Sequence, residues 1–221
     1  MKKTLILLPW ILITTQAQAG VVVGGTRFVF PEHQNTLSLE VKNTGSLPFL
    51  IKTQITADSG AVPFIATPPL FAVEAGHENA VRIIRTDGTL PDDRESLFYI
   101  SIAAIPSGKP QPHSLQIALR SRFKLFYRPD ALQANARTAY QQIAWHQNEN
   151  GLVINNSTPY YITLSQLRIN QRDIPIVEML APFGQEQFNV CARGEVCQLQ
   201  WQTLDDTANL TPLQQAHFPS H

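Results

Sequence analysis

Apolar and polar residues alternate along this chain in short runs, a pattern typical of half-buried β-strands. One such run is SLQIALRSRFKLFYRP, which extends from Ser114 to Pro129. Its apolar parity comprises Leu115, Ile117, Leu119, Phe123, Leu125 and Tyr127, and its polar parity comprises Gln116, Arg120, Arg122, Lys124 and Arg128. Taken alone, this pattern favours an ordinary core strand with a solvated basic face.

Similar runs occur on both sides of the Arg128-Pro129 pair. Before it lie VVVGGTRFVF, TLSLEVKN, FLIKTQI, AVRIIRT, LFYISIAAI and LQIALRSRFKLFY. After it lie QQIAWHQ, GLVINN, YYITLSQLRI, IPIVEML, VCQLQWQTL and the segment from Gln214 to Phe218. Helical periodicity is weak, and DALQANARTAY is interpreted as a short helix or a linker turn. About six strands on each side predict an all-β chain of two sandwich domains of immunoglobulin size, residues 20–128 and 129–221.

Proline breaks the hydrogen-bond ladder of a sheet, and most of the 16 prolines fall in predicted turns. Thr67-Pro68-Pro69 is a candidate cis-proline corner between two strands. The trans form is nevertheless the expectation, because only about 5% of X-Pro bonds are cis.

Residues 1–19 have the pattern of an export signal. Lys2 and Lys3 precede the apolar run LILLPWILI, and Ala17-Gln18-Ala19 resembles a cleavage site. No apolar run reaches the roughly 18 residues that a membrane span needs. We therefore expect an exported, soluble mature chain that is not an integral membrane protein.

The net charge of the expected mature chain is close to zero. Without Lys2 and Lys3, the number of Lys and Arg residues falls from 17 to 15 against 17 Asp and Glu, which gives a formal charge of −2. This balance argues against nucleic acid as a partner, so any basic site must be local.

The chain has two cysteines, Cys191 and Cys197, in the segment NVCARGEVCQL. In an oxidising compartment they are expected to form a disulfide. A loop of about seven residues gives a stabilisation of roughly 2.4 kcal/mol by chain entropy, so the bond would staple a hairpin. The spacing does not fit a CxxC redox or zinc motif.

Candidate chemistry is sparse. The histidines show neither HxxxH nor HxH spacing, which argues against a metal site; they are His33, His77, His113, His146, His217 and His221. No nucleophile elbow, P-loop or glycine fingerprint is present. The sequence therefore predicts no enzyme, no cofactor and no small-molecule substrate.

Several long motifs resemble the periplasmic pilus chaperones of chaperone–usher systems. They are TRFVF (Thr26 to Phe30), FIATPPLFAVEAGHENAVRIIRT (Phe64 to Thr86), LPDDRESLFYISIAAIP (Leu90 to Pro106) and LQIALRSRFKLFYRP (Leu115 to Pro129), followed more thinly by GLVINNSTPYYITLSQL and MLAPFGQ. The resemblance implies two immunoglobulin-like β-sandwich domains in a boomerang arrangement with an interdomain cleft. The short segment SGKPQPHS is similar to the short-loop branch of that family.

The resemblance also implies a role for the alternating run. Pilus subunits lack their final strand, and the chaperone fills the resulting groove with a strand of its own before an outer-membrane usher takes the subunit. Leu115, Ile117 and Leu119 would be the groove-filling side chains. Phe123, Leu125 and Tyr127 would belong to the core of the chaperone itself.

Two sets of charged residues match motifs of the family. Arg27 and Lys124 match the cleft cations that bind the C-terminal carboxylate of the subunit, although an isolated cation on a strand is ordinarily solvated. Simple alternation places Lys124 and Leu119 on opposite faces, which predicts a bulge or twist near Ser121 if both face one partner.

Glu95, Arg128 and Asp206 resemble an interdomain charge cluster. The match is weakest at Asp206, because Asp205-Asp206-Thr207-Ala208 stands where the family shows Asn-Asp-Tyr-Gly. The alternative is a set of surface ion pairs worth at most about 1 kcal/mol.

Two other functions are considered for the whole chain. A pilin or adhesin subunit should have the sequence pattern of one truncated domain. A periplasmic hydrolase would need a nucleophile–base pair, and none is found.

Overall fold

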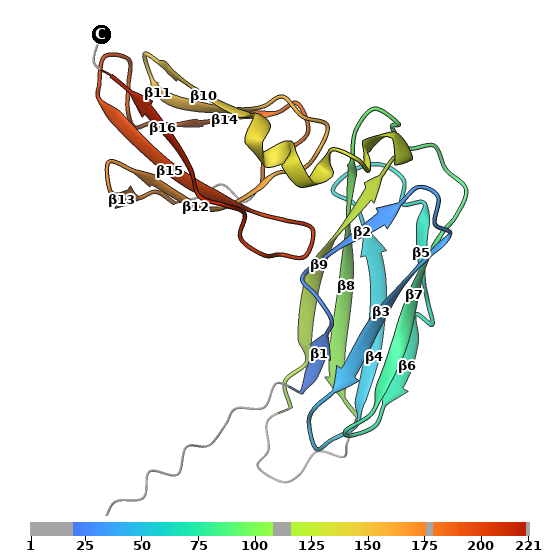
Figure 1. The fold of residues 1–221 in the computed structure, drawn as a ribbon. Helices are drawn as coiled ribbons and strands as arrows, with labels where there is room; N and C mark the ends of the chain where they lie inside the picture. Colours follow the sequence, from blue (N-terminus) through green and yellow to red (C-terminus); the bar gives the residue numbers. More distant parts are fainter. Residues whose placement is uncertain (1–19, 108–115, 176–178, 220–221) are drawn as a thin grey trace, which may run out of the picture.

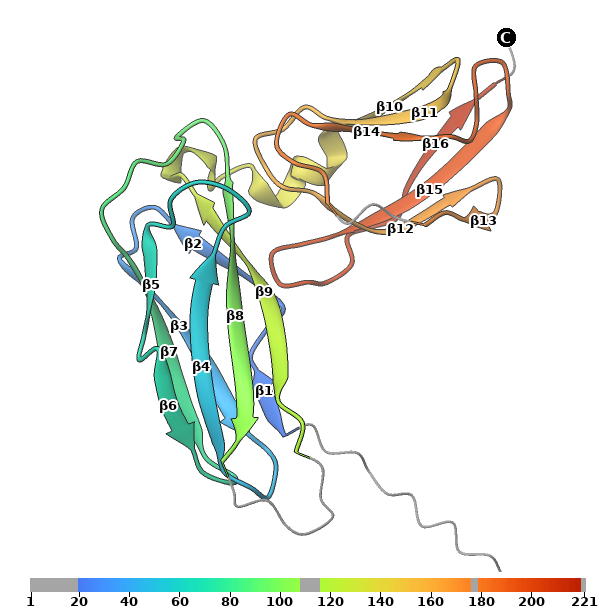
Figure 2. The ribbon, with the colours of Figure 1, turned by 180° about the vertical axis from the view of Figure 1, so that it is seen from behind.

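The computed structural model describes residues 20–107, 116–175 and 179–219. They form two β-sandwich domains that meet at an angle like the arms of a boomerang (Figures 1 and 2). Each domain has its own apolar core. The prediction of an all-β chain with two immunoglobulin-like domains is confirmed. Among the described residues, no helix is long and apolar enough to cross a membrane.

The first domain packs one four-stranded sheet on one five-stranded sheet. The first has the order β1 (Val21–Val23), β3 (Thr36–Asn43), β7 (Glu78–Arg85) and β5 (Phe64–Thr67). The second has the order β2 (Arg27–Pro31), β9 (Leu119–Arg128), β8 (Ser96–Pro106), β4 (Phe49–Thr56) and β6 (Leu70–Val73). Strands β2 and β9 run parallel, whereas the other pairs are antiparallel.

Alternation along the strands produces this core directly. In β3, Leu39 and Val41 are buried while Glu40 and Lys42 are exposed, as the period of two requires. Phe64 lies at the centre of the core and makes edge contacts with the rings of Phe30 and Phe98, at centroid distances of 5.1 and 4.9 Å. Such edge-to-face pairs add stability beyond the apolar area that they bury.

The second domain begins with two short 3₁₀ helices, η1 (Asp130–Leu132) and η2 (Ala136–Gln142), and η2 extends two residues beyond the segment interpreted as a helix or linker turn. Its core contains Trp201, and the partly buried Trp145 packs against this core, with its ring 5.4 Å from that of Trp201. One sheet has the order β10 (Ile143–Asn148), β11 (Gly151–Asn156) and β14 (Gln185–Phe188). The other has the order β13 (Arg172–Asp173), β12 (Thr163–Ile169), β15 (Cys197–Leu204) and β16 (Gln214–Phe218).

Several strands differ from the sequence-based prediction. The run VVVGGTRFVF is not one strand, because it divides at Gly24 and Gly25 into β1 and β2, which join different sheets. Strands β5 and β6 were not predicted, and they flank a Thr67-Pro68 bond that is cis, so the trans expectation is wrong. Strand β14 was also missed, since its sequence QEQF buries Phe188 alone.

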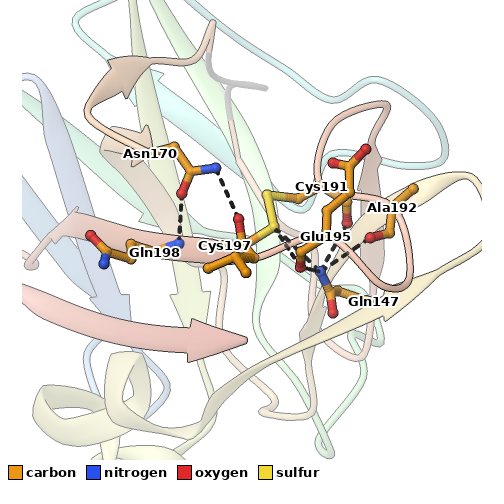
Figure 3. Close-up of a disulfide and its surroundings, with 8 residues drawn as sticks. Gln147, Asn170, Cys191, Ala192, Glu195, Cys197 and Gln198 are labelled. Atoms are coloured by element: carbon orange, nitrogen blue, oxygen red, sulfur yellow. Dashed lines mark hydrogen bonds between the residues drawn. A yellow bond between two sulfur atoms is a disulfide. The ribbon is translucent and has the colours of Figure 1, made fainter. Parts of the chain in front are cut away.

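The predicted disulfide is present, and it joins Cys191 in the connection after β14 to Cys197, the first residue of β15 (Figure 3). The side-chain amide of Gln147 in β10 donates hydrogen bonds to the carbonyl oxygens of Cys191 and Glu195. Asn170 donates to the carbonyl oxygen of Val196. The loop is therefore held by side-chain hydrogen bonds as well as by the covalent bond.

Candidate functional site

Strand β9 changes its environment along its length. Its last residues, Leu125 to Arg128, are all buried. Its first residues, Leu119 to Arg122, are all exposed. Leu119 is 62% exposed and Ile117, just before the strand, is 60% exposed, which is unusual for large aliphatic side chains on an alternating strand. Leu115 lies outside the described residues.

The exposed part of β9 also has an open backbone edge. On one side, β9 pairs with β8 from Leu119 to Tyr127. On the other side, the pairing with β2 begins at Lys124, where Arg27 is the partner. Among the described residues, no strand pairs with positions 119–123 on that side. Unpaired N–H and C=O groups at such an edge can pair with a further strand.

Lys124 belongs to the face of β9 that is turned toward the second domain. Two other even-numbered residues define this face: the ring of Phe126 lies 5.7 Å from that of Tyr161, and Arg128 contacts Asp206. The pairing of β9 with β8 is unbroken from position 119 to position 127, so of the bulge or twist predicted near Ser121 the structure contains no bulge. None is needed, because a strand added at the open edge can contact residues on both faces of the sheet.

Arg27 lies where β2 meets the second domain. Its guanidinium carbon is 4.8 Å from the centroid of the Phe126 ring, and its Nη1 donates a hydrogen bond of 3.2 Å to the carbonyl oxygen of Leu204. Burial lowers the pKa of Arg27, while the charges of Asp206 and Glu95 raise it. The guanidinium is thus a partly desolvated cation, which binds an anion more strongly than a fully hydrated one does.

Arg128, Glu95 and Asp206 come together at the junction of the two domains. Arg128 Nε donates to Glu95 Oε1 at 2.7 Å, and its Nη1 and Nη2 donate to the two carboxylate oxygens of Asp206, both at 2.7 Å. The second oxygen of Glu95 accepts a hydrogen bond from the backbone N–H of Tyr161 at 2.8 Å. The paired Asp206 contact is the bidentate geometry that favours an arginine–carboxylate pair.

Two of the three side chains in this cluster are buried, unlike those of an ordinary surface ion pair, whereas the side chain of Asp206 is 43% exposed. Arg128 is 6% exposed and Glu95 is 3% exposed. Burial raises the pKa of Glu95, and the positive charge of Arg128 opposes this shift. For Arg128, burial acts against the charged form, but the hydrogen bonds to Asp206 and the charge of Glu95 raise its pKa. Removing one partner would leave a buried charge without compensation.

Two further contacts between the domains were not predicted. The backbone N–H of Glu95 donates to the carbonyl oxygen of Pro159 at 2.9 Å. The guanidinium of Arg94 lies 5.0 Å from the centroid of the Phe183 ring. Neither contact has a local sequence signal, because the residues involved are distant in the chain.

The angle between the domains encloses a cavity of about 510 Å³. Residues of both domains line it, including Arg27, Arg128, Tyr160, Tyr161, Leu204 and Asp206. The predicted cleft therefore exists, and Arg27 forms part of its wall. Leu125 and Tyr127 lie in the core of the first domain, with Phe123 packed against it, as the sequence predicted.

Two family models match the chain. One, described as pili and flagellar-assembly chaperone, PapD N-terminal domain, matches residues 20–133. The other, described as pili assembly chaperone PapD, C-terminal domain, matches residues 138–215.

Individual proteins of similar sequence and structure carry related descriptions. The chain is 37% identical over 219 residues to the uncharacterized fimbrial chaperone YcbF of Escherichia coli K12, covering 95% of this chain and 93% of that protein. It is 34% identical over 208 residues to the chaperone protein FimC of Escherichia coli O6:H1, covering 91% and 86%. A chain in the structure of the Salmonella enterica SafA pilin in complex with the SafB chaperone is 27% identical, with a TM-score of 0.79, covering 93% of this chain and 98% of that one.

Proposed function

Because the chain belongs to the family of PapD-like pilus-assembly chaperones, we propose that it captures pilus subunits by lending them strand β9. In this proposal the chaperone pairs β9 with a subunit, prevents premature polymerisation and delivers the subunit to an outer-membrane usher. The SafB structure, in which a chaperone of the family is bound to a pilin, supports this class of partner.

The open edge of β9 carries the proposal. Positions 119–123 offer unpaired backbone groups, and Ile117 and Leu119 offer exposed apolar side chains beside them. A subunit with an unfilled groove needs both features, because added strands bind through backbone hydrogen bonds and are selected through side-chain pockets. Burial of each aliphatic side chain contributes roughly 1.5 to 3 kcal/mol before ordering costs.

Arg27 and Lys124 are proposed to bind the C-terminal carboxylate of the subunit. They are cross-strand partners at the point where the open edge ends, so a carboxylate placed there can approach both cations. Charge-assisted hydrogen bonds contribute roughly 1.5 to 3 kcal/mol each. The partial burial of Arg27 favours this role over that of a solvated surface charge.

The cluster of Glu95, Arg128 and Asp206 is proposed to set the angle between the domains. It links the residue before β8, strand β9 and the segment after β15 by hydrogen bonds of 2.7 Å. A rigid angle keeps the cleft open at the width that a subunit requires, which lowers the cost of binding by preorganisation.

We place this activity in the periplasm. The signal-like residues 1–19 and the disulfide between Cys191 and Cys197 support an exported protein in an oxidising compartment. The proposed activity is binding and release, and it requires no covalent chemistry. A second candidate, a pilin or adhesin subunit, is disfavoured because the family models span two domains of this chain.

The carboxylate anchor can be tested with Arg27→Ala, Lys124→Ala and the double variant. Each is titrated with a pilin encoded in the same operon, and with that pilin amidated at its C-terminus. We expect each single variant to bind the free pilin at least about tenfold more weakly, since about 1.4 kcal/mol changes affinity tenfold. The double variant should add little, because either loss leaves the carboxylate half paired.

Amidation should weaken binding to the wild-type chain by a similar factor. Circular dichroism and a thermal melt serve as controls, because these variants should fold normally. Unchanged affinity for the amidated pilin would exclude the carboxylate anchor. Failure of any operon pilin to form a one-to-one complex in size-exclusion chromatography would contradict the chaperone function itself.

A further inference from the structure

The proposed function leaves most of the basic face of β9 unexplained. Arg120, Arg122 and Lys124 alternate along the strand, and the unbroken pairing with β8 places them on one face. Phe126 and Arg128 show that this face looks toward the second domain. Carboxylate anchoring uses Lys124 alone of the three, so Arg120 and Arg122, on the exposed part of this face, have no assigned role.

Arg122 is held in a defined position on this face. Its guanidinium carbon lies 3.4 Å from the centroid of the Tyr99 ring. Its Nη2 donates a hydrogen bond of 3.0 Å to Asp58, and the hydroxyl of Tyr99 donates to the other carboxylate oxygen of Asp58, also at 3.0 Å. An arginine that is already ordered loses less side-chain entropy when it binds a partner.

The local charge is opposite in sign to that of the whole mature chain. Along β9 this wall of the first domain carries Arg120, Arg122 and Lys124, and Asp58 is the acidic side chain that pairs with Arg122. The wall therefore has an excess of positive charge, whereas the chain without residues 1–19 has a formal charge of −2. A local patch of this kind selects for partners of negative charge and accelerates their approach.

The open edge determines where such a partner places its side chains. A strand that pairs with positions 119–123 and ends beside Lys124 must bring the residues before its end past Arg122 and then Arg120. If the C-terminal residue lies beside Lys124, the residue two positions before it lies beside Arg122 and the residue four positions before it lies beside Arg120. Because side chains alternate, these two residues are on the same face as the two arginines.

We propose that Arg122, assisted by Arg120, recognises acidic side chains at the second and fourth positions before the C-terminus of the subunit. In the free chaperone the guanidinium of Arg122 pairs with the carboxylate of Asp58. In the complex a carboxylate of the subunit replaces Asp58 in this contact. This assignment rests on the proposed function. It implies that Arg120 and Arg122 of β9 help to determine which subunits the chaperone accepts.

Synthetic peptides provide the test. The peptide alternates valine and threonine, has a free C-terminal carboxylate, and carries Glu, Gln or Lys at its second and fourth positions before the end. Binding to the wild-type chain, to Arg122→Glu and to Arg122→Gln is measured by fluorescence polarisation at low ionic strength. Arg82→Glu is the matched control, because Arg82 is an exposed arginine of β7 in the opposite sheet.

We expect the wild-type chain to bind the Glu peptide about two- to fivefold more tightly than the Gln peptide, as exposed ion pairs do, and the Lys peptide most weakly. Arg122→Glu should reverse the order of the Glu and Lys peptides, Arg122→Gln should weaken the preference, and Arg82→Glu should leave it unchanged. The preference should disappear at about 1 M salt, where screening acts within roughly 3 Å.

An amidated Glu peptide separates this assignment from the proposed function. If amidation weakens binding but the Glu, Gln and Lys peptides bind equally to the wild-type chain, the assignment to Arg122 is wrong and the carboxylate anchor stands. If Arg122→Glu keeps the preference for the Glu peptide, the assignment is likewise wrong. Equal binding of the amidated and free peptides would count against the anchor on which the geometry depends.

Discussion

The two halves of strand β9 have the same alternating pattern but opposite environments. In the half from Leu125 to Arg128, both parities are buried: Leu125 and Tyr127 enter the core of the first domain, and Phe126 and Arg128 face the second domain. In the half from Leu119 to Arg122, both parities are exposed. The first half holds the molecule together, and the second half is available to a partner.

The neighbours of the strand account for this difference. Strand β2 covers the edge of β9 from Lys124 onward, and the second domain packs over the same region. Beside positions 119–123, the described part of the chain supplies a neighbour on the β8 side alone. An apolar side chain on a strand is thus buried or exposed according to what lies next to it.

The largest effect should come from placing the same substitution in each half. Leu125→Asp puts a carboxylate into the core, and we expect it to destabilise the first domain by more than about 4 kcal/mol. Leu119→Asp should change stability by less than about 0.5 kcal/mol but abolish capture of a pilin. Chemical denaturation and a pull-down measure the two effects. A similar loss of stability in both variants would show that the two halves do not differ.

The next largest effect should come from the cation of the buried half, Arg128. Arg128→Ala leaves Glu95 buried without its partner, and we expect a loss of roughly 3 to 5 kcal/mol. The angle between the domains should also become variable, which small-angle X-ray scattering would detect as an increased range of dimensions. A variant as stable as the wild type, with unchanged scattering, would contradict a structural role for the buried cluster.

The disulfide offers a perturbation remote from β9. Replacing Cys191 and Cys197 together by serine should lower the stability of the second domain by about 2 kcal/mol, because the bond closes a short loop. Binding of a pilin to the exposed half of the strand should not change. Thermal melts monitor stability, and mass spectrometry of the exported protein checks the bond. Free thiols in that sample would contradict the oxidised state.

The smallest effect should come from the exposed cation. In Arg122→Ala, the ion pair with Asp58 is lost, but both side chains are more than half exposed, so we expect at most about 1 kcal/mol. The comparison with Arg128→Ala is the informative result, since both residues lie on the same face of one strand. A loss as large as that of Arg128→Ala would show that Arg122 has a structural role.

The sequence alone determined the features that depend on local physics. A period of two predicts strands because successive side chains point to opposite faces, and this predicted the two sandwich domains and the core positions of Leu125 and Tyr127. The two cysteines of the chain can pair only with each other within one molecule, and the predicted export to an oxidising compartment therefore predicted the disulfide. The long family motifs indicated the same two domains and the cleft.

The tertiary structure alone decided which side chains far apart in the chain come together. Asp206 reaches Arg128 across 78 positions, although its local motif departs from that of the family. Strand β14 exists because β11 pairs with it, although its own sequence is polar. The exposure of Leu119 follows from where β2 begins to pair with β9. Alternation specifies two faces of a strand, but the neighbours that cover each face or edge are set by long-range packing.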